Sequence, residues 1–166
     1  MAAAGTSIFF VLAPGVAAGL VPWWLTGWRV RPTPLPLRVV GLVLIVAGVP
    51  VLVSAFVRFV REGLGTPAPV APPEHLVVGG LYRYVRNPMY LAVLSIIVGQ
   101  ALLLGQPSLL VYAALAGAAM VAFVLAYEQP SLHRRFGAEY DAYRRAVPGW
   151  WPRLRPWRPG GQRPGG

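Results

Sequence analysis

The sequence predicts an all-α, polytopic membrane protein with about four transmembrane helices, a C-terminal helical hairpin and an amphipathic tail helix in the membrane interface. Three observations predict this class. Of the 166 residues, 56% are hydrophobic and only 12% are charged, too few polar groups to cover a soluble domain of this length. The apolar residues form runs of about 20, which as helices span roughly 30 Å of hydrocarbon. The charged residues lie between these runs.

The charge balance indicates a lipid partner rather than a nucleic acid. All 15 cations are arginine and the net charge is +10. Because the arginines flank apolar runs, they are typical of membrane topology and of contact with anionic headgroups. The absence of cysteine excludes disulfides and thiolate metal sites. His75 and His133 lack the spacing of metal ligands, so we expect solvated loop positions and no metal site.

Two N-terminal spans are predicted. The first covers about Ser7–Trp28, with a kink at Pro14 and an interfacial belt of tryptophans at its far end, Trp23, Trp24 and Trp28. Three arginines and three prolines in residues 29–38 indicate a short extended connector. The second span covers about Val39–Val60, with a further kink predicted at Pro50. Residues 1–60 therefore form the N-terminal part of the molecule.

A broken loop follows the second span. Residues 61–80 contain four prolines and four glycines, which disfavour a helix. Two interpretations stay open. The segment is either a plain linker or a cover over a site, since long loops in compact proteins are often functional.

A helical hairpin is predicted next. Asn87 has the residue type of an N-cap, and Pro88 suits the first helical position because the missing N–H has no helical partner there. The third span covers Met89–Leu104, the turn is Gly105-Gln106-Pro107, and the fourth span covers Ser108–Tyr127. Two antiparallel helices of similar length bring the next residue, Glu128, back to Asn87.

The mouth of this hairpin is the candidate site. A helix N-terminus attracts anions through its N–H groups and dipole, and Arg83 and Arg86 lie just before it. Together with the Glu128 carboxylate, this arrangement suits a zwitterion such as the amino-acid end of a cofactor. Structural interpretations stay open as well. The arginines could be topology anchors, Asn87-Pro88 a simple cap, and Glu128 an interfacial carboxylate.

The tail has the pattern of an amphipathic helix. One apolar stripe recurs at spacings of four, four, three and four residues: Leu132, Phe136, Tyr140, Tyr143 and Val147. Such a helix lies in the interface, and Val147-Pro148 ends it. Residues 61–158 then form the catalytic region of loop, hairpin and tail, and residues 159–166 are expected to be disordered.

The arginine distribution predicts orientation. The turn between the third and fourth spans carries no charge, whereas residues 61–88 carry three arginines and the tail carries eight. By the positive-inside rule the loop and tail face the cytoplasm. We therefore expect an integral protein of a bacterial-type inner or plasma membrane, with its site facing the cytoplasm.

Two blocks of sequence carry a family resemblance. The first is GLYRYVRNPMY, from Gly80 to Tyr90. The second is EQPSL from Glu128, then FGAEYDAY from Phe136, and then Val147-Pro148. The chain resembles the isoprenylcysteine carboxyl methyltransferase and phospholipid methyltransferase superfamily of integral membrane enzymes over about residues 61–152. It departs from the pattern at Gln129, where the family has a second glutamate.

The resemblance implies a methyltransferase that uses S-adenosylmethionine, with Arg86 and Glu128 as its catalytic residues. Its implied cofactor-binding residues are Tyr82, Arg83, Arg86, Asn87, Pro88, Tyr90, Glu128, Tyr140, Val147 and Pro148. The cofactor's carboxylate would meet the helix start, its ammonium would meet Glu128, and its sulfonium would meet the face of Tyr90 or Tyr127. The implied acceptor is a lipophilic small molecule or a lipidated partner.

Two other functions stay open at this stage. One is an NADPH-dependent membrane reductase of the sterol reductase type, because sterol reductases carry a similar Arg-His-Pro-x-Tyr block. The other is a non-catalytic lipid-binding or scaffold protein, because Gln129 departs from the family pattern. The acceptor atom and the oligomeric state do not follow from the sequence.

Overall fold

The computed structural model describes residues 13–63 and 75–158, and within these ranges it contains helices, turns and loops but no strand. The all-α prediction therefore agrees with the described part of the chain. The start of the first predicted span, most of the loop at 61–80 and the predicted disordered tail at 159–166 lie outside the described residues.

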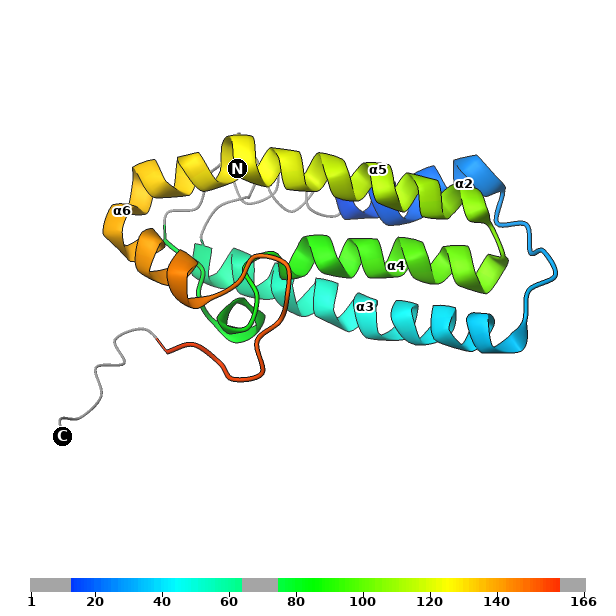
Figure 1. Ribbon diagram of the computed structural model, residues 1–166, viewed down its shortest axis with the longest axis horizontal. Helices are drawn as coiled ribbons and strands as arrows, with labels where there is room; N and C mark the ends of the chain where they lie inside the picture. The colour runs from blue at the N-terminus through cyan, green and yellow to red at the C-terminus, as the bar shows by residue number, and fades with distance from the viewer. Residues whose placement is uncertain (1–12, 64–74, 159–166) are drawn as a thin grey trace.

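Three long helices form the body of the molecule. Helices α3 (Leu35–Gly63), α4 (Pro88–Leu104) and α5 (Pro107–Phe123) run side by side, with α4 between the other two (Figure 1). Two helical stretches, Leu35–Arg58 and Pro107–Ala146, are long and apolar enough to cross a membrane, and α4 is an apolar helix of shorter length. The predicted second, third and fourth spans thus correspond to α3, α4 and α5.

Helices α3 and α4 approach closely because glycines face each other across their contact. A Cβ atom placed on Gly41 would lie 2.6 Å from the carbonyl oxygen of Gly99. A Cβ atom on Gly99 would lie 2.7 Å from the carbonyl oxygen of Gly41. No side chain fits at either position without separating the helices, so these glycines set how closely the C-terminal half of α4 packs against α3.

The N-terminal helix is fastened to the body by polar contacts. It comprises the π-helix η1 (Val16–Leu20) and α2 (Val21–Thr26). Pro22 has no N–H to offer the carbonyl groups four and five residues before it, those of Ala18 and Ala17. Gln100 Nε2 donates to the Ala18 oxygen at 2.6 Å, and Tyr112 Oη donates to the Ala17 oxygen at 2.8 Å. Side chains of α4 and α5 thus satisfy the carbonyls that the proline leaves without a donor.

Removing one of these donors should loosen the N-terminal helix. We expect Tyr112→Phe, which deletes only the hydroxyl, to lower the free energy of unfolding by about 1 kcal/mol. Unfolding in mixed detergent and SDS micelles, followed by circular dichroism, measures this value. Ser54→Ala is the control, because the Ser54 hydroxyl bonds to Val51 within its own helix. Equal losses for the two variants would show that the Tyr112 hydroxyl does not fasten one helix to another.

The turn of the hairpin agrees with the prediction. Gly105 ends α4 in the left-handed conformation, with φ of 65°, and its N–H bonds to the Ala101 carbonyl. Gln106 Nε2 reaches across to the carbonyl oxygen of Arg29 at 2.6 Å. The turn is therefore fixed both by its own backbone and by the connector that follows α2.

A helix spans Gln129–Ala146, where the amphipathic stripe lies, but two features of it were not predicted from the sequence. The chain does not break after Glu128, because α5 continues through the π-helix η3 (Val124–Glu128) into α6 (Gln129–Ala146). The break comes instead inside α6, at Gly137, with φ of 48° and ψ of −123°. Essentially only glycine adopts this conformation, and the second half of α6 turns back at this point (Figure 1). Residue periodicity does not register a reversal of this kind.

The predicted apolar stripe is covered by the protein itself. Tyr140, Tyr143 and Val147 are buried and form one cluster, which Leu132 and Phe136 join from the other side of the bend. Further members of the cluster are Leu76, Val78, Ala146 and Trp157. The apolar side of the second half of α6 therefore packs against the segments before α4 and after Pro148 that carry Leu76, Val78 and Trp157.

Candidate functional site

Asn87 occupies the N-cap position of α4 but does not cap the helix with its side chain, so the predicted cap is wrong in that respect. Its Nδ2 instead donates to the carbonyl oxygen of Gly149 at 3.1 Å, and its backbone N–H points to the same oxygen at 3.3 Å. Pro88 is the first residue of α4, as predicted. The N–H groups of the first turn of α4 are therefore not covered by the Asn87 side chain.

A tail segment, Val147–Arg158, lies along the residues that precede α4 (Figure 1). Besides the Asn87 N–H, three backbone N–H groups bond across this contact: Arg86 to Pro148 at 2.9 Å, Arg153 to Tyr84 at 3.0 Å and Trp157 to Arg83 at 2.9 Å. The hydroxyl of Tyr143 adds a bond to the Tyr82 carbonyl at 2.6 Å. The two blocks that carry the family resemblance are thus joined in space.

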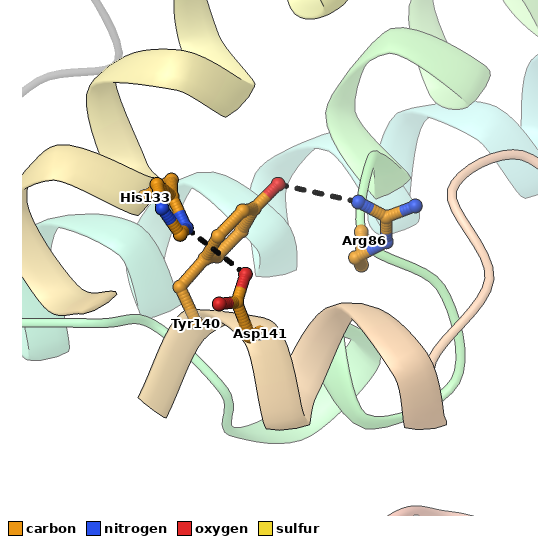
Figure 2. Close-up of polar contacts among 4 residues, drawn as sticks. All are labelled: Arg86, His133, Tyr140 and Asp141. Carbon is orange, nitrogen blue, oxygen red and sulfur yellow. Dashed lines mark hydrogen bonds and ion pairs between the residues drawn. The ribbon is translucent and has the colours of Figure 1, made fainter. Parts of the chain in front are cut away.

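Arg86 is held in a fixed orientation. Its Nε donates to the carbonyl oxygen of Val147 at 2.8 Å, and its Nη1 donates to the hydroxyl of Tyr140 at 3.3 Å (Figure 2). Arg83 is engaged elsewhere, because its Nε donates to the carbonyl oxygen of Trp157 at 2.6 Å. The guanidinium of Arg86, rather than that of Arg83, lies beside the start of α4.

Glu128, which follows the second helix of the hairpin, lies beside the start of α4, as the sequence predicts. Tyr90 Oη donates to Glu128 Oε2 at 3.2 Å, joining residues 38 positions apart. Glu128 is half-buried and lies close enough to Arg86 for their charges to interact. The π-helical turn η3 changes the side-chain register just before α6, and π-turns of this kind frequently occur at functional sites.

A small cavity separates the cation from the carboxylate. Its volume is about 50 Å³, and seven residues line it: Tyr82, Arg86, Asn87, Pro88, Met89, Tyr90 and Glu128. A volume of this size admits one or two small polar groups, since a water molecule takes up about 30 Å³ of the liquid. The cavity thus has a basic wall, an acidic wall and an aromatic hydroxyl between them.

Most of the predicted site residues meet here. Tyr82, Arg86, Asn87, Pro88, Tyr90 and Glu128 line the cavity. Tyr140, Val147 and Pro148 contact the side chain or backbone of Arg86 from the tail. Two predicted residues lie apart from it. Arg83 is outside the lining, and the exposed Tyr127 stacks on Phe123 with ring centroids 5.3 Å apart.

Sequence reasoning missed three residues of the site. Met89 lines the cavity, Gly149 accepts both bonds from Asn87, and the ring of Trp150 lies 6.3 Å from that of Tyr90. A tryptophan among the arginines of the tail is typical of the membrane interface, so its residue type alone does not assign Trp150 to the site. Its position two residues after Pro148 of the Val147-Pro148 motif was the signal that could have placed it near α4.

The family model for phospholipid methyltransferases matches residues 37–139. The chain belongs to this family. Neither the curated proteins nor the solved structures contain a match. The family match confirms the predicted resemblance and covers α3, the hairpin and Glu128, but ends just before Tyr140 and the tail segment. Membership in the phospholipid methyltransferase family, together with two long apolar helices, indicates a membrane methyltransferase.

Proposed function

We propose that this member of the phospholipid methyltransferase family transfers the methyl group of S-adenosylmethionine to a lipophilic or membrane-delivered acceptor. The observation that carries the proposal is the cavity at the mouth of the hairpin, where the Arg86 cation and the Glu128 carboxylate face a common space. A zwitterion with an α-carboxylate and an α-ammonium matches such a pair. The family match supports the same reaction.

The residues present fit the amino-acid end of the cofactor. Arg86 Nε and Nη1 bond to protein oxygens, so Nη2 would remain for the ligand's carboxylate, together with the first-turn N–H groups of α4. Glu128 would accept from the ligand's ammonium, with Tyr90 fixing its orientation. A cavity of about 50 Å³ holds no more than this end. The adenosine would lie outside it, against Val147 and Pro148.

Bound S-adenosylmethionine supplies an electrophilic methyl carbon. That methyl group would pass from the sulfur to the acceptor's nucleophilic atom, with S-adenosylhomocysteine as the other product and, for an amine acceptor, release of a proton. The residues described here hold the carboxylate and the ammonium and so orient the methyl group toward the acceptor. The rings of Tyr90 and Trp150 would face the sulfonium and limit the access of water.

An apolar cavity next to the site supports a lipophilic acceptor. Its volume is about 370 Å³, and its walls come from the N-terminal helix, α3 and α4: Pro14, Gly15, Ala18, Gly19, Leu52, Val53, Phe56 and Met89. Met89 also lines the charged cavity. A hydrocarbon chain in the larger space would therefore end beside the cation and the carboxylate.

In this proposal the chain crosses the membrane four times, with the N-terminal helix and α4 adding to the two long apolar helices. Residues 1–60 anchor the protein, residues 61–158 form the catalytic region, and the site faces the cytoplasm. The arginines that flank the start of α4 and fill the tail support this orientation. A bacterial-type inner membrane fits the same pattern.

Cofactor binding tests the proposal. We expect the purified protein in detergent to bind S-adenosylhomocysteine with micromolar affinity in a calorimetric titration, a range set by typical cofactor concentrations. NADPH is the matched alternative ligand and should not bind. Binding of NADPH alone would favour a reductase, and binding of neither ligand would favour a non-catalytic lipid-binding protein; either outcome overturns the proposal.

A further inference from the structure

The bend in α6 is bridged by a contact between two side chains. His133 Nδ1 lies 3.0 Å from Asp141 Oδ1, one residue on each side of Gly137 (Figure 2). The two residues are eight positions apart, which in a straight α-helix corresponds to a rise of about 12 Å. The contact therefore exists only while the chain is bent at Gly137.

The bent half of α6 carries a residue that reaches the candidate site. Tyr140 directly precedes Asp141 and is 1% exposed. Its hydroxyl accepts the bond from Arg86 Nη1 at 3.3 Å (Figure 2). A change in the bend angle would move Tyr140 and Asp141 together, because they are neighbours on one helical turn. The position of the Arg86 guanidinium is thus linked to the geometry at Gly137.

We propose that His133 and Asp141 are positioning residues for the cofactor site. Their hydrogen bond holds α6 bent, so that Tyr140 keeps Arg86 directed into the cavity. The inference rests on the proposed function, because the direction of Arg86 matters only if its guanidinium binds the cofactor's carboxylate. Neither residue lines the cavity, and their side chains are 58% and 35% exposed, so we assign neither a direct contact with the ligand. Both act through Tyr140.

The first test measures affinity for S-adenosylhomocysteine. Asp141→Ala removes the acceptor and should weaken binding about five- to tenfold, the loss expected when one hydrogen bond to a charged group is misplaced. Asp141→Asn keeps an oxygen that can accept from His133 Nδ1–H and should bind within about twofold of the original protein. Glu139→Ala is the control, because Glu139 is an exposed carboxylate on the same half of α6.

The second test separates positioning from general stability. In a Tyr140→Phe background the hydroxyl that links the bend to Arg86 is gone. Asp141→Ala should then change the affinity by less than about twofold, since coupled residues do not have additive effects. Equal losses with and without the Tyr140 hydroxyl would overturn the inference, as would a failure of Asp141→Asn to restore binding.

A third measurement does not depend on the cofactor. Hydrogen exchange of the backbone amides in residues 138–146 reports how firmly the bent half of α6 is held. We expect Asp141→Ala to speed this exchange at least about threefold in the ligand-free protein, and Asp141→Asn and Glu139→Ala to leave it unchanged. Unchanged exchange in Asp141→Ala would show that the His133–Asp141 contact does not hold α6 bent, whether or not the protein binds S-adenosylhomocysteine. Absence of S-adenosylhomocysteine binding would instead contradict the proposed function.

Discussion

Glu128→Gln is expected to weaken binding of S-adenosylhomocysteine by about 10- to 100-fold, because it removes the negative charge opposite the ligand's ammonium. The substitution keeps the shape of the side chain and leaves an oxygen that can accept the bond from Tyr90 Oη, which now reaches Glu128 Oε2 at 3.2 Å. The loss should therefore reflect charge rather than misfolding. Titration calorimetry in detergent measures it.

Glu139→Gln is the matched control for this prediction. Glu139 is an exposed carboxylate of α6, so its neutralisation makes the same change in net charge away from the cavity. We expect its affinity to equal that of the original protein. Equal affinities for Glu128→Gln and the original protein would remove Glu128 from the binding site and leave it as an interfacial carboxylate.

Arg86→Met is expected to weaken binding by about 1–3 kcal/mol, which corresponds to a loss of roughly 5- to 150-fold. Methionine keeps much of the apolar stem but offers no donor to the ligand, to Val147 or to Tyr140. Two effects combine in this variant. The ligand's carboxylate loses its cation, and the tail segment loses one of its contacts with the residues before α4.

Arg83→Met separates these two effects. Arg83 contacts the tail segment through the Trp157 carbonyl but does not line the cavity. This variant should therefore reproduce the loosening of the tail and lower the affinity by less than about threefold. A loss as large as that of Arg86→Met would mean that attachment of the tail, and not the Arg86 charge, governs binding.

The hairpin was predictable because its signals are local and strong. Pro88 at a helix start, Gly105 in the turn and two apolar runs of similar length define the two helices and their direction. Once the directions are known, the meeting of Asn87 with Glu128 follows from length alone. The hydrogen bond from Tyr90 to Glu128 shows that the start of α4 and the end of the second apolar run do lie together.

The tail was less predictable because its structure depends on backbone geometry that periodicity does not reveal. A stripe at helical spacing reads the same whether the helix is straight or reversed, and only the φ of 48° at Gly137 distinguishes them. The glycine was present in the sequence, but many helical glycines cause no bend. The orientation of α6 therefore could not be derived from the pattern of its residues.

The detailed bonding of the site also depended on contacts between distant segments. Asn87 has the residue type of a cap, and only the approach of Gly149 explains why its side chain points to the tail instead. Arg83 and Arg86 look equivalent in the sequence. The separate partners they find in the tail, the carbonyl groups of Trp157 and Val147, distinguish them.

Binding of two truncated ligands tests most directly whether Arg86 and Glu128 hold opposite ends of one molecule. One ligand is S-adenosylhomocysteine without its carboxylate, and the other lacks its amino group. We expect Arg86→Met to lower the affinity for the decarboxylated ligand by less than about threefold, the part due to the tail, and Glu128→Gln to leave that for the deaminated ligand unchanged within about twofold. Full losses for both variants with both ligands would contradict the proposal that the hairpin mouth holds the amino-acid end of the cofactor.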